Sequence, residues 1–97
     1  MSEMRELEIF LSDWPSLRPH FTRGAIFIID PTISLKLACE AFVKDDRPLV
    51  EEWLNKNLIR RPSDEEDKTW SKAPVREFQF GIVQPYVLIQ PIDLTKH

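Results

Sequence analysis

Two stretches of the chain are dense in β-branched and aromatic residues. The longer one covers residues 78–90 and reads FQFGIVQPYVLIQ, and the shorter one covers residues 25–29 and reads AIFII. Such side chains fit the pleated, half-buried surface of a sheet, so the two stretches are predicted to pair as strands. Proline is confined to strand ends, bulges and edges. We therefore expect two strands, over 75–84 and 86–90, joined at Pro85 by either a tight hairpin or a kink.

Further details of the sheet follow from the same pattern. Residues 25–29 are apolar without alternation, which is typical of a strand covered on both faces, so we expect this strand at the centre of the sheet. Gly81 is expected to mark a bulge. Residues 58–60 are predicted to form a short edge strand. The last two strands are expected to be antiparallel.

Apolar residues at helical spacing predict three helices, over 3–11, 33–44 and 48–56. In the second helix, apolar residues cover most of the circumference, which requires burial against more than one neighbour. These neighbours are the sheet and either another helix or a second subunit. Before the third helix, Asp45 and Asp46 can supply capping oxygens to the free backbone amides.

Two shorter helices are predicted from signals in their first turns. One begins at Asp13 or Trp14, with a proline at a position where helices tolerate it. The other begins at Ser63, and Glu66 three residues later completes a capping box. Trp70 is the only large apolar residue of this last helix.

These elements predict an α+β fold, in which helices pack against a small sheet of three or four strands that is at least partly antiparallel. The 97 residues are expected to form a single globular domain over 1–97, with residues 95–97 frayed. The predicted core consists of Phe10, Trp14, Phe27, Ile29, Leu35, Ala38, Phe42, Val50, Trp53, Leu54, Phe80, Ile82, Val83 and Leu88.

Charge and composition narrow the class of protein. The chain has 13 Lys and Arg against 16 Asp and Glu, a net charge of −3, whereas nucleic-acid binders show a basic footprint. Cys39 is the single cysteine, so no intrachain disulfide is possible. The charged N-terminus does not resemble a signal peptide, and no apolar run is long enough to span a bilayer. We therefore predict a cytoplasmic protein without membrane contact.

No motif in the sequence points to catalysis, so no catalytic residue, metal or cofactor is predicted. Asp45 and Asp46 could ligate a metal, but adjacent carboxylates point in different directions, and capping explains both residues. Cys39 could be a nucleophile, but it lies in the middle of an apolar helix, where a buried thiol is favoured. Whether the protein is an enzyme stays open, and the absence of a catalytic constellation favours a non-enzyme.

Five residues are candidates for a binding site. Arg23 and Asp30 flank the first strand and, with His20, could converge on an anion. The alternative is a surface histidine and a structural pair between Arg23 and Asp30. No sequence motif determines their geometry.

The other candidates lie near the C-terminal strands. Gln84, Tyr86 and Gln90 lie at alternating positions on one strand face. They could bind a peptide or a small ligand, or hydrogen-bond to one another inside the sheet. Trp70 could be a lid or an interface anchor, because tryptophan is enriched at interaction hot spots. Its alternative role is to cover the core.

A helix-turn-helix interpretation is also open. The two helices over 33–44 and 48–56 are followed by Lys56, Arg60 and Arg61. A recognition helix carries basic and amide residues on its outer face, but the second helix carries Glu51 and Glu52 there, which phosphates repel. Nucleic-acid binding is therefore the least favoured interpretation.

The chain resembles a small bacterial family known as a domain of unknown function. The resemblance covers roughly residues 14–90, and its most specific part is the ending IVQPYVLIQ. Residues 32–37 are less acidic here than in the family. The resemblance implies a bacterial cytoplasmic domain and implies no activity. The other matching features are FTRG at 21–24, the apolar strand, Asp30-Pro31, Asp45-Asp46, Val50, Trp53-Leu54, PSDE at 62–65 and Trp70.

The leading functional hypothesis is a non-enzymatic protein-interaction module that binds a protein partner or self-associates, for example as a homodimer. It rests on the wide apolar surface at 35–43, on strands longer than the domain requires, and on the missing catalytic constellation. The alternative is a small-ligand or enzyme site between the sheet and the Trp70 helix. A second alternative is nucleic-acid binding.

Overall fold

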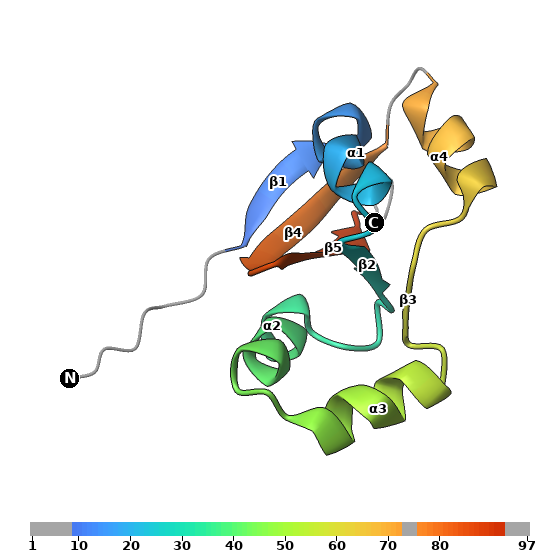
Figure 1. Ribbon diagram of the computed structural model, residues 1–97. Helices are drawn as coiled ribbons and strands as arrows, with labels where there is room; N and C mark the ends of the chain where they lie inside the picture. Colours follow the sequence, from blue (N-terminus) through green and yellow to red (C-terminus); the bar gives the residue numbers. More distant parts are fainter. Residues whose placement is uncertain (1–8, 73–75, 93–97) are drawn as a thin grey trace.

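A mixed sheet forms the middle layer of the molecule (Figure 1). The computed structural model describes residues 9–72 and 76–92, and in this part of the chain five strands form one sheet in the order β1-β4-β5-β2-β3. The β5–β2 pair is parallel, and the other three pairs are antiparallel. The strands are β1 (Phe10–Asp13), β2 (Ile26–Ile29), β3 (Ile59–Arg60), β4 (Glu77–Val83) and β5 (Tyr86–Pro91).

Helices cover both faces of this sheet. The helices α1 (Trp14–Thr22) and α4 (Asp64–Ser71) lie on one side, and α2 (Leu35–Val43) and α3 (Arg47–Asn55) lie on the other (Figure 1). Because side chains alternate along a strand, β2, β4 and β5 each contribute to two separate hydrophobic clusters. In β5, for example, Val87 and Ile89 belong to the α1/α4 cluster and Leu88 belongs to the α2/α3 cluster.

The sequence-based prediction of the fold class is confirmed, with two changes in the sheet. The two strand-forming stretches pair through β2 and β5, and β4 and β5 form an antiparallel hairpin around the cis Gln84–Pro85 peptide. The sheet has five strands in the described residues rather than three or four. The expected central position of residues 25–29 is wrong, because β2 lies between β5 and the edge strand β3, and β5 is central.

The additional strand is β1, where the periodicity predicts the end of a helix. Phe10 lies opposite Phe80 of β4, and the centroids of the two rings are 5.5 Å apart. Apolar residues three and four positions apart fit a helix, but pairing with β4 satisfies this backbone in an extended conformation, so tertiary context overrides the local pattern. The remainder of the predicted helix, residues 3–8, lies outside the described residues, as do 95–97.

Two further expectations about β4 and the core are wrong. Gly81 marks no bulge, because the β4–β5 register runs without interruption from Phe78 to Val83. Three predicted core residues are largely exposed: Phe10 at 44%, Leu54 at 43% and Ile82 at 50%. Phe10 and Ile82 are strand residues on a part of the sheet that the described helices leave uncovered.

Three helices end in the same way, with a residue in the left-handed conformation. The φ angles are 74° at Gly24, 57° at Asp45 and 60° at Asn57. At the end of α2, the amide of Asp45 donates to the carbonyl of Phe42 (3.1 Å), and the next amide donates to the carbonyl of Ala41 (2.9 Å). This is the Schellman pattern, which satisfies the last carbonyls of a helix. Asp45 therefore closes α2, and Asp46 caps α3.

The substitution Gly24→Ala is expected to lower the free energy of unfolding by about 1 kcal/mol, because a side chain disfavours this φ angle. The new Cβ would lie 3.5 Å from the Arg61 guanidinium, an ordinary contact, so the cost comes from the backbone. Urea denaturation followed by circular dichroism measures the change. The matched substitution Asn57→Gly, at a position with the same backbone conformation, is expected to be neutral or stabilising. Equal destabilisation by both variants would contradict this account.

Candidate functional site

A cavity of about 240 Å³ opens between the α2–α3 connection and the β4–β5 turn. Its two sides come from segments far apart in the sequence, residues 41–51 and 83–86. Apolar side chains form its floor, and polar and charged side chains form its rim. The floor consists of Ala41, Phe42, Val50 and Val83, and the rim of Asp45, Asp46, Arg47, Glu51, Gln84 and Tyr86.

Tyr86 forms an aromatic wall of this cavity. Its ring packs edge-on against Phe42 and Phe27, with centroid distances of 6.0 and 5.5 Å. The Arg61 guanidinium lies 5.4 Å from the centroid of the Phe27 ring. Tyr86 is therefore held by neighbours on its far side while 37% of its surface stays exposed.

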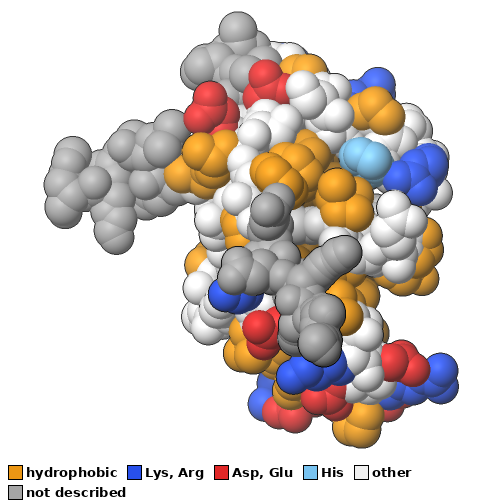
Figure 2. Space-filling model, turned by 90° about the vertical axis from the view of Figure 1, so that its left-hand side faces the viewer, with side chains coloured by type: hydrophobic (Ala, Val, Ile, Leu, Met, Phe, Trp, Pro, Cys, Tyr) orange, Lys and Arg blue, Asp and Glu red, His pale blue; other side chains and the backbone are white. Residues whose placement is uncertain are grey.

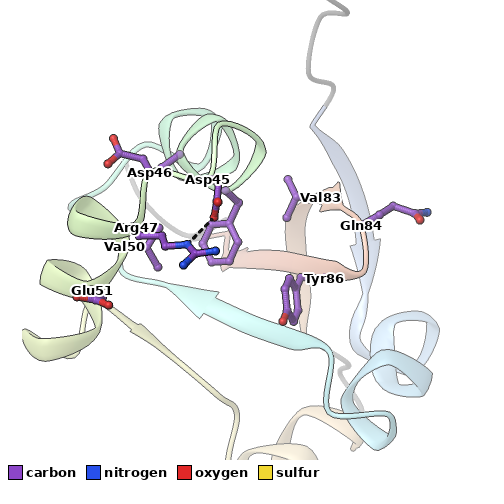
Figure 3. Close-up of a pocket in the computed structure, with 10 residues that line it drawn as sticks. Asp45, Asp46, Arg47, Val50, Glu51, Val83, Gln84 and Tyr86 are labelled. Atoms are coloured by element: carbon purple, nitrogen blue, oxygen red, sulfur yellow. Dashed lines mark hydrogen bonds and ion pairs between the residues drawn. The ribbon is translucent and has the colours of Figure 1, made fainter.

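The rim of the cavity carries three carboxylates and one guanidinium. Arg47 Nε lies 3.3 Å from an Asp45 oxygen, and the Asp46 carboxylate accepts from the amide of Leu49 as the N-cap of α3. Figure 3 shows Arg47 and Tyr86 on opposite sides of the opening, whereas Gln84 points away from it. Of the two candidates in this turn, Tyr86 therefore faces the cavity and Gln84 borders it.

The structure does not bring Arg23 and Asp30 together. Arg23 caps the C-terminus of α1, where a guanidinium nitrogen lies 2.5 Å from Nδ1 of His20. Partial burial, together with the charge of Arg23, lowers the pKa of His20. Asp30 follows the opposite end of β2 and accepts from the amide and hydroxyl of Thr32, which lowers the pKa of this carboxyl. The anion site suggested by the sequence is therefore not formed, because Arg23 contacts His20 and Asp30 contacts Thr32.

Trp70 lies in an aromatic cluster between the sheet, α1 and α4. Its ring is edge-on to Trp14 and to Phe78, with centroid distances of 5.1 and 5.0 Å. Trp14 and Phe78 are both completely buried. The structure therefore places Trp70 over the core of the α1/α4 face, away from the cavity beside Tyr86.

A buried carboxylate that the sequence did not single out connects the same two helices. One oxygen of Asp67 accepts from the indole N–H of Trp14 (2.8 Å) and from Arg18 Nε (2.7 Å), and the other accepts from Arg18 at 3.0 Å. The hydrogen bond from Arg18 is the main cause that lowers the pKa of Asp67. Asp67 is one of four acids in the first turn of α4, and no local signal distinguishes it from the exposed ones.

Gln90 has a structural role inside the sheet. Its side-chain amide donates to the carbonyls of Asp30 (3.0 Å) and Ile33 (2.7 Å), and its oxygen accepts from Gln79 at 2.6 Å. The side chain is buried and fully hydrogen-bonded. Gln90 therefore connects the β2–α2 loop to the centre of the sheet and does not face the cavity together with Tyr86.

The Cys39 thiol is buried inside α2, and burial raises its pKa to about 11. The thiolate is the nucleophilic form of cysteine, so Cys39 is not activated at neutral pH. In the described residues, no group of three or more His, Cys, Asp or Glu side chains is arranged to hold a metal ion.

The basic residues of the helix-turn-helix interpretation are engaged within the molecule. Lys56 pairs with Glu52 at 2.9 Å. Arg60 makes two hydrogen bonds to Glu66, at 2.9 and 2.8 Å. The Arg61 guanidinium lies over the ring of Phe27. The arrangement therefore does not present these three side chains as a free basic surface.

The outer edge of β1 is a second candidate for a functional surface. In the described part of the chain, no strand pairs with this edge. Trp14 N donates to Arg76 O (2.9 Å), so by the alternation of an antiparallel ladder Leu11 directs its N–H and C=O groups outward and Asp13 directs its N–H outward. The C=O of Asp13, the N-cap residue, accepts the first hydrogen bond of α1. Leu11 is 74% exposed. Figure 2 shows the side of the molecule on which β1 lies, where hydrophobic side chains gather at the surface.

Comparison with known protein families identifies the family of this chain. A protein-family profile matches residues 4–91, which is nearly the whole sequence. The chain belongs to the family described as "Protein of unknown function (DUF2288)". The resemblance to a domain of unknown function, predicted from the sequence, is thus confirmed. None of the described helices of this DUF2288 protein is long and apolar enough to cross a membrane.

A solved structure shares the fold of this DUF2288 protein. It is the NMR solution structure of PA1075 from Pseudomonas aeruginosa, which has 27% sequence identity and a TM-score of 0.78. The similarity covers 93% of this chain and 82% of PA1075. A search of curated proteins finds no match. The comparisons establish family and fold, and the function has to be argued from the surface.

Proposed function

We propose that this chain is a non-enzymatic, cytoplasmic protein-interaction module that self-associates by pairing the β1 strands of two copies. The observation that supports this proposal is the outer edge of β1, which no strand of the described residues pairs and which carries exposed apolar side chains. Proteins usually protect sheet edges with charges, prolines or bulges, because an unprotected edge pairs readily with another strand. Here Phe10 and Leu11, which are 44% and 74% exposed, occupy the edge instead.

The register of the pairing follows from the direction of the backbone groups. Hydrogen-bonded pairs between two edges form only between outward-facing residues, and in β1 Leu11 directs both its N–H and its C=O outward. An antiparallel pairing of two copies around a two-fold axis at Leu11 satisfies this condition, with Leu11 opposite Leu11 of the second copy. Phe10 then lies opposite Ser12. The pairing continues the sheet across both copies, which is strand addition at an exposed edge.

The apolar surface beside the edge supports the same proposal. Cross-strand partners share a face, so Phe10 and Phe80 stand side by side, and Ile82 continues the row two residues along β4. Ile82 is 50% exposed. A second copy paired at β1 brings its own row next to this one and covers both. The apolar residues of α2 contribute less than the sequence suggested, because the sheet and α3 bury most of them.

The substitution Leu11→Lys is expected to weaken self-association at least about tenfold, because like charges directly opposite each other destabilise a strand pair. Sedimentation equilibrium of the wild type and the variant over a concentration series measures the change. Leu37→Lys serves as the matched control, because Leu37 is also exposed (48%) but lies on α2. A wild type that stays monomeric at high micromolar concentration would overturn the proposal. So would equal weakening by both substitutions.

A second proposal is small-ligand binding, and the observation that favours it is the cavity beside Tyr86. The position differs from the one that the sequence suggested, because Trp70 belongs to the aromatic cluster on the other face. Nucleic-acid binding is not proposed, because Lys56, Arg60 and Arg61 are engaged in contacts within the molecule.

A further inference from the structure

The cavity beside Tyr86 combines features that select for one class of ligand, independently of any pairing at β1. Its floor is apolar, so it favours a ligand with an apolar body. Its volume of about 240 Å³ fits a single side chain or a small molecule and excludes a folded element. Phe42 and Tyr86 are held against each other with their rings edge to face, so the aromatic wall is preformed.

The charges at the rim favour a cationic ligand over an anionic one. Asp45, Asp46 and Glu51 line the opening, and the Asp46 carboxylate points away from it as the N-cap of α3 (Figure 3). Among the described residues that line the cavity, Arg47 is the basic one. Arg47 is already paired with Asp45 at 3.3 Å. An anionic ligand would have to compete with Asp45 for this guanidinium at an opening that Glu51 also lines. A cationic ligand meets a net negative opening.

The aromatic wall adds a second preference for a cation. The face of a tyrosine or phenylalanine ring attracts an ammonium group within about 6 Å of its centroid. Tyr86 borders the opening on the side opposite the α2–α3 connection (Figure 3). An ammonium group at the mouth of the cavity would therefore have an aromatic ring on one side and Glu51 on the other.

We propose that this cavity binds an organic cation, an ammonium group on an alkyl or aryl body. The apolar body occupies the floor against Phe42, Val50 and Val83, and the ammonium group stays at the mouth near Tyr86 and Glu51. Two sources share this chemistry, a free amine and a lysine side chain of a partner peptide. The contacts that recognise the ammonium group are the same for both.

A titration followed by ¹⁵N–¹H correlation spectra tests this proposal. The probes are 2-phenylethylamine, its charge-reversed counterpart 3-phenylpropanoate, and Nα-acetyl-lysine N-methylamide for the peptide source. We expect the free amine or the lysine derivative to shift the amides on both sides of the cavity, at 47 and 49–51 on one side and at 83 and 86 on the other. We expect 3-phenylpropanoate to leave them unchanged. Binding of the carboxylate as tightly as the amine, or no shift with either ammonium probe at millimolar concentration, would overturn the proposal.

Two variants separate recognition of the cation from a general effect of charge. Tyr86→Leu and Glu51→Gln are each expected to weaken binding of the ammonium probes by about two- to fivefold, the size of an exposed cation–π or ion-pair contact. Glu65→Gln makes the same change in net charge at an exposed position on α4, remote from the cavity, and is expected to leave the affinity unchanged. An equal loss with Glu51→Gln and Glu65→Gln would contradict the proposed site. Unchanged spectra away from the cavity show that each variant is folded.

Discussion

Replacing Trp14 by alanine is expected to lower the free energy of unfolding by about 4 kcal/mol, within the range for large aromatic side chains truncated in a core. Trp14 is completely buried, and its ring contacts the rings of Phe21, Trp70 and Phe78 at centroid distances of 5.7, 5.1 and 5.9 Å. It begins α1 directly after β1. The substitution therefore leaves a cavity where the sheet, α1 and α4 meet.

Urea denaturation of the wild type and of Trp14→Ala, followed by far-ultraviolet circular dichroism, measures this loss. Trp14→Phe keeps a ring in place and is expected to lose about half as much. Leu54→Ala removes an apolar side chain that is 43% exposed on α3, and it is expected to cost less than about 1 kcal/mol. If Trp14→Ala were no more destabilising than Leu54→Ala, the aromatic cluster would not be the centre of the α1/α4 core.

Replacing Asp67 by alanine is expected to lower the free energy of unfolding by about 2 kcal/mol at pH 7. The main reason is that the buried indole N–H of Trp14 loses its acceptor, and an unsatisfied buried donor costs about 1–3 kcal/mol. Arg18 loses its partner as well. Asp64→Ala, an exposed acid in the first turn of the same helix, is the matched control, and it is expected to cost less than about 1 kcal/mol.

The pH dependence of this difference tests the cause. The hydrogen bond from Arg18 lowers the pKa of Asp67 in the folded protein, so its contribution is complete above the unfolded pKa of about 3.9. The contribution is lost as the pH falls through the lower folded pKa. The difference in stability between the wild type and Asp67→Asn is therefore expected to shrink below about pH 4. A difference that stays constant between pH 7 and pH 2.5 would show that the ionised form of Asp67 contributes nothing.

The sequence pattern predicted only part of the candidate binding site. Tyr86 is a candidate because polar residues alternate along its strand, and it does face a cavity. The other side of that cavity comes from residues 41–51, where the sequence indicated helices and their caps but no site together with Tyr86. Asp45 and Asp46 do close one helix and cap the next, and these local roles also place them at the rim. Whether these residues line a cavity depends on the segment that packs opposite them, here the β4–β5 turn. The local sequence pattern holds no information about that segment.

Elements whose cause is local were predicted correctly from the sequence. Ser63 and Glu66 form the predicted capping box, Asp13 caps α1, and Pro85 lies in the turn of the hairpin. Each of these depends on groups within a few residues of one another. Their hydrogen bonds and steric limits therefore act in the same way in almost any tertiary setting.

The tertiary structure alone decided what depends on partners distant in the sequence. Phe10–Asp13 became a strand because β4 offered an edge, and Asp67 was buried because Trp14 and Arg18, about fifty residues away, converge on it. The same holds for the order of the strands and for the cavity beside Tyr86. The sequence by itself determined the helix caps and the hairpin turn, the α+β class and the family. The contacts between those elements form only when the chain packs. These contacts determine the exposed edge of β1 and the cavity beside Tyr86.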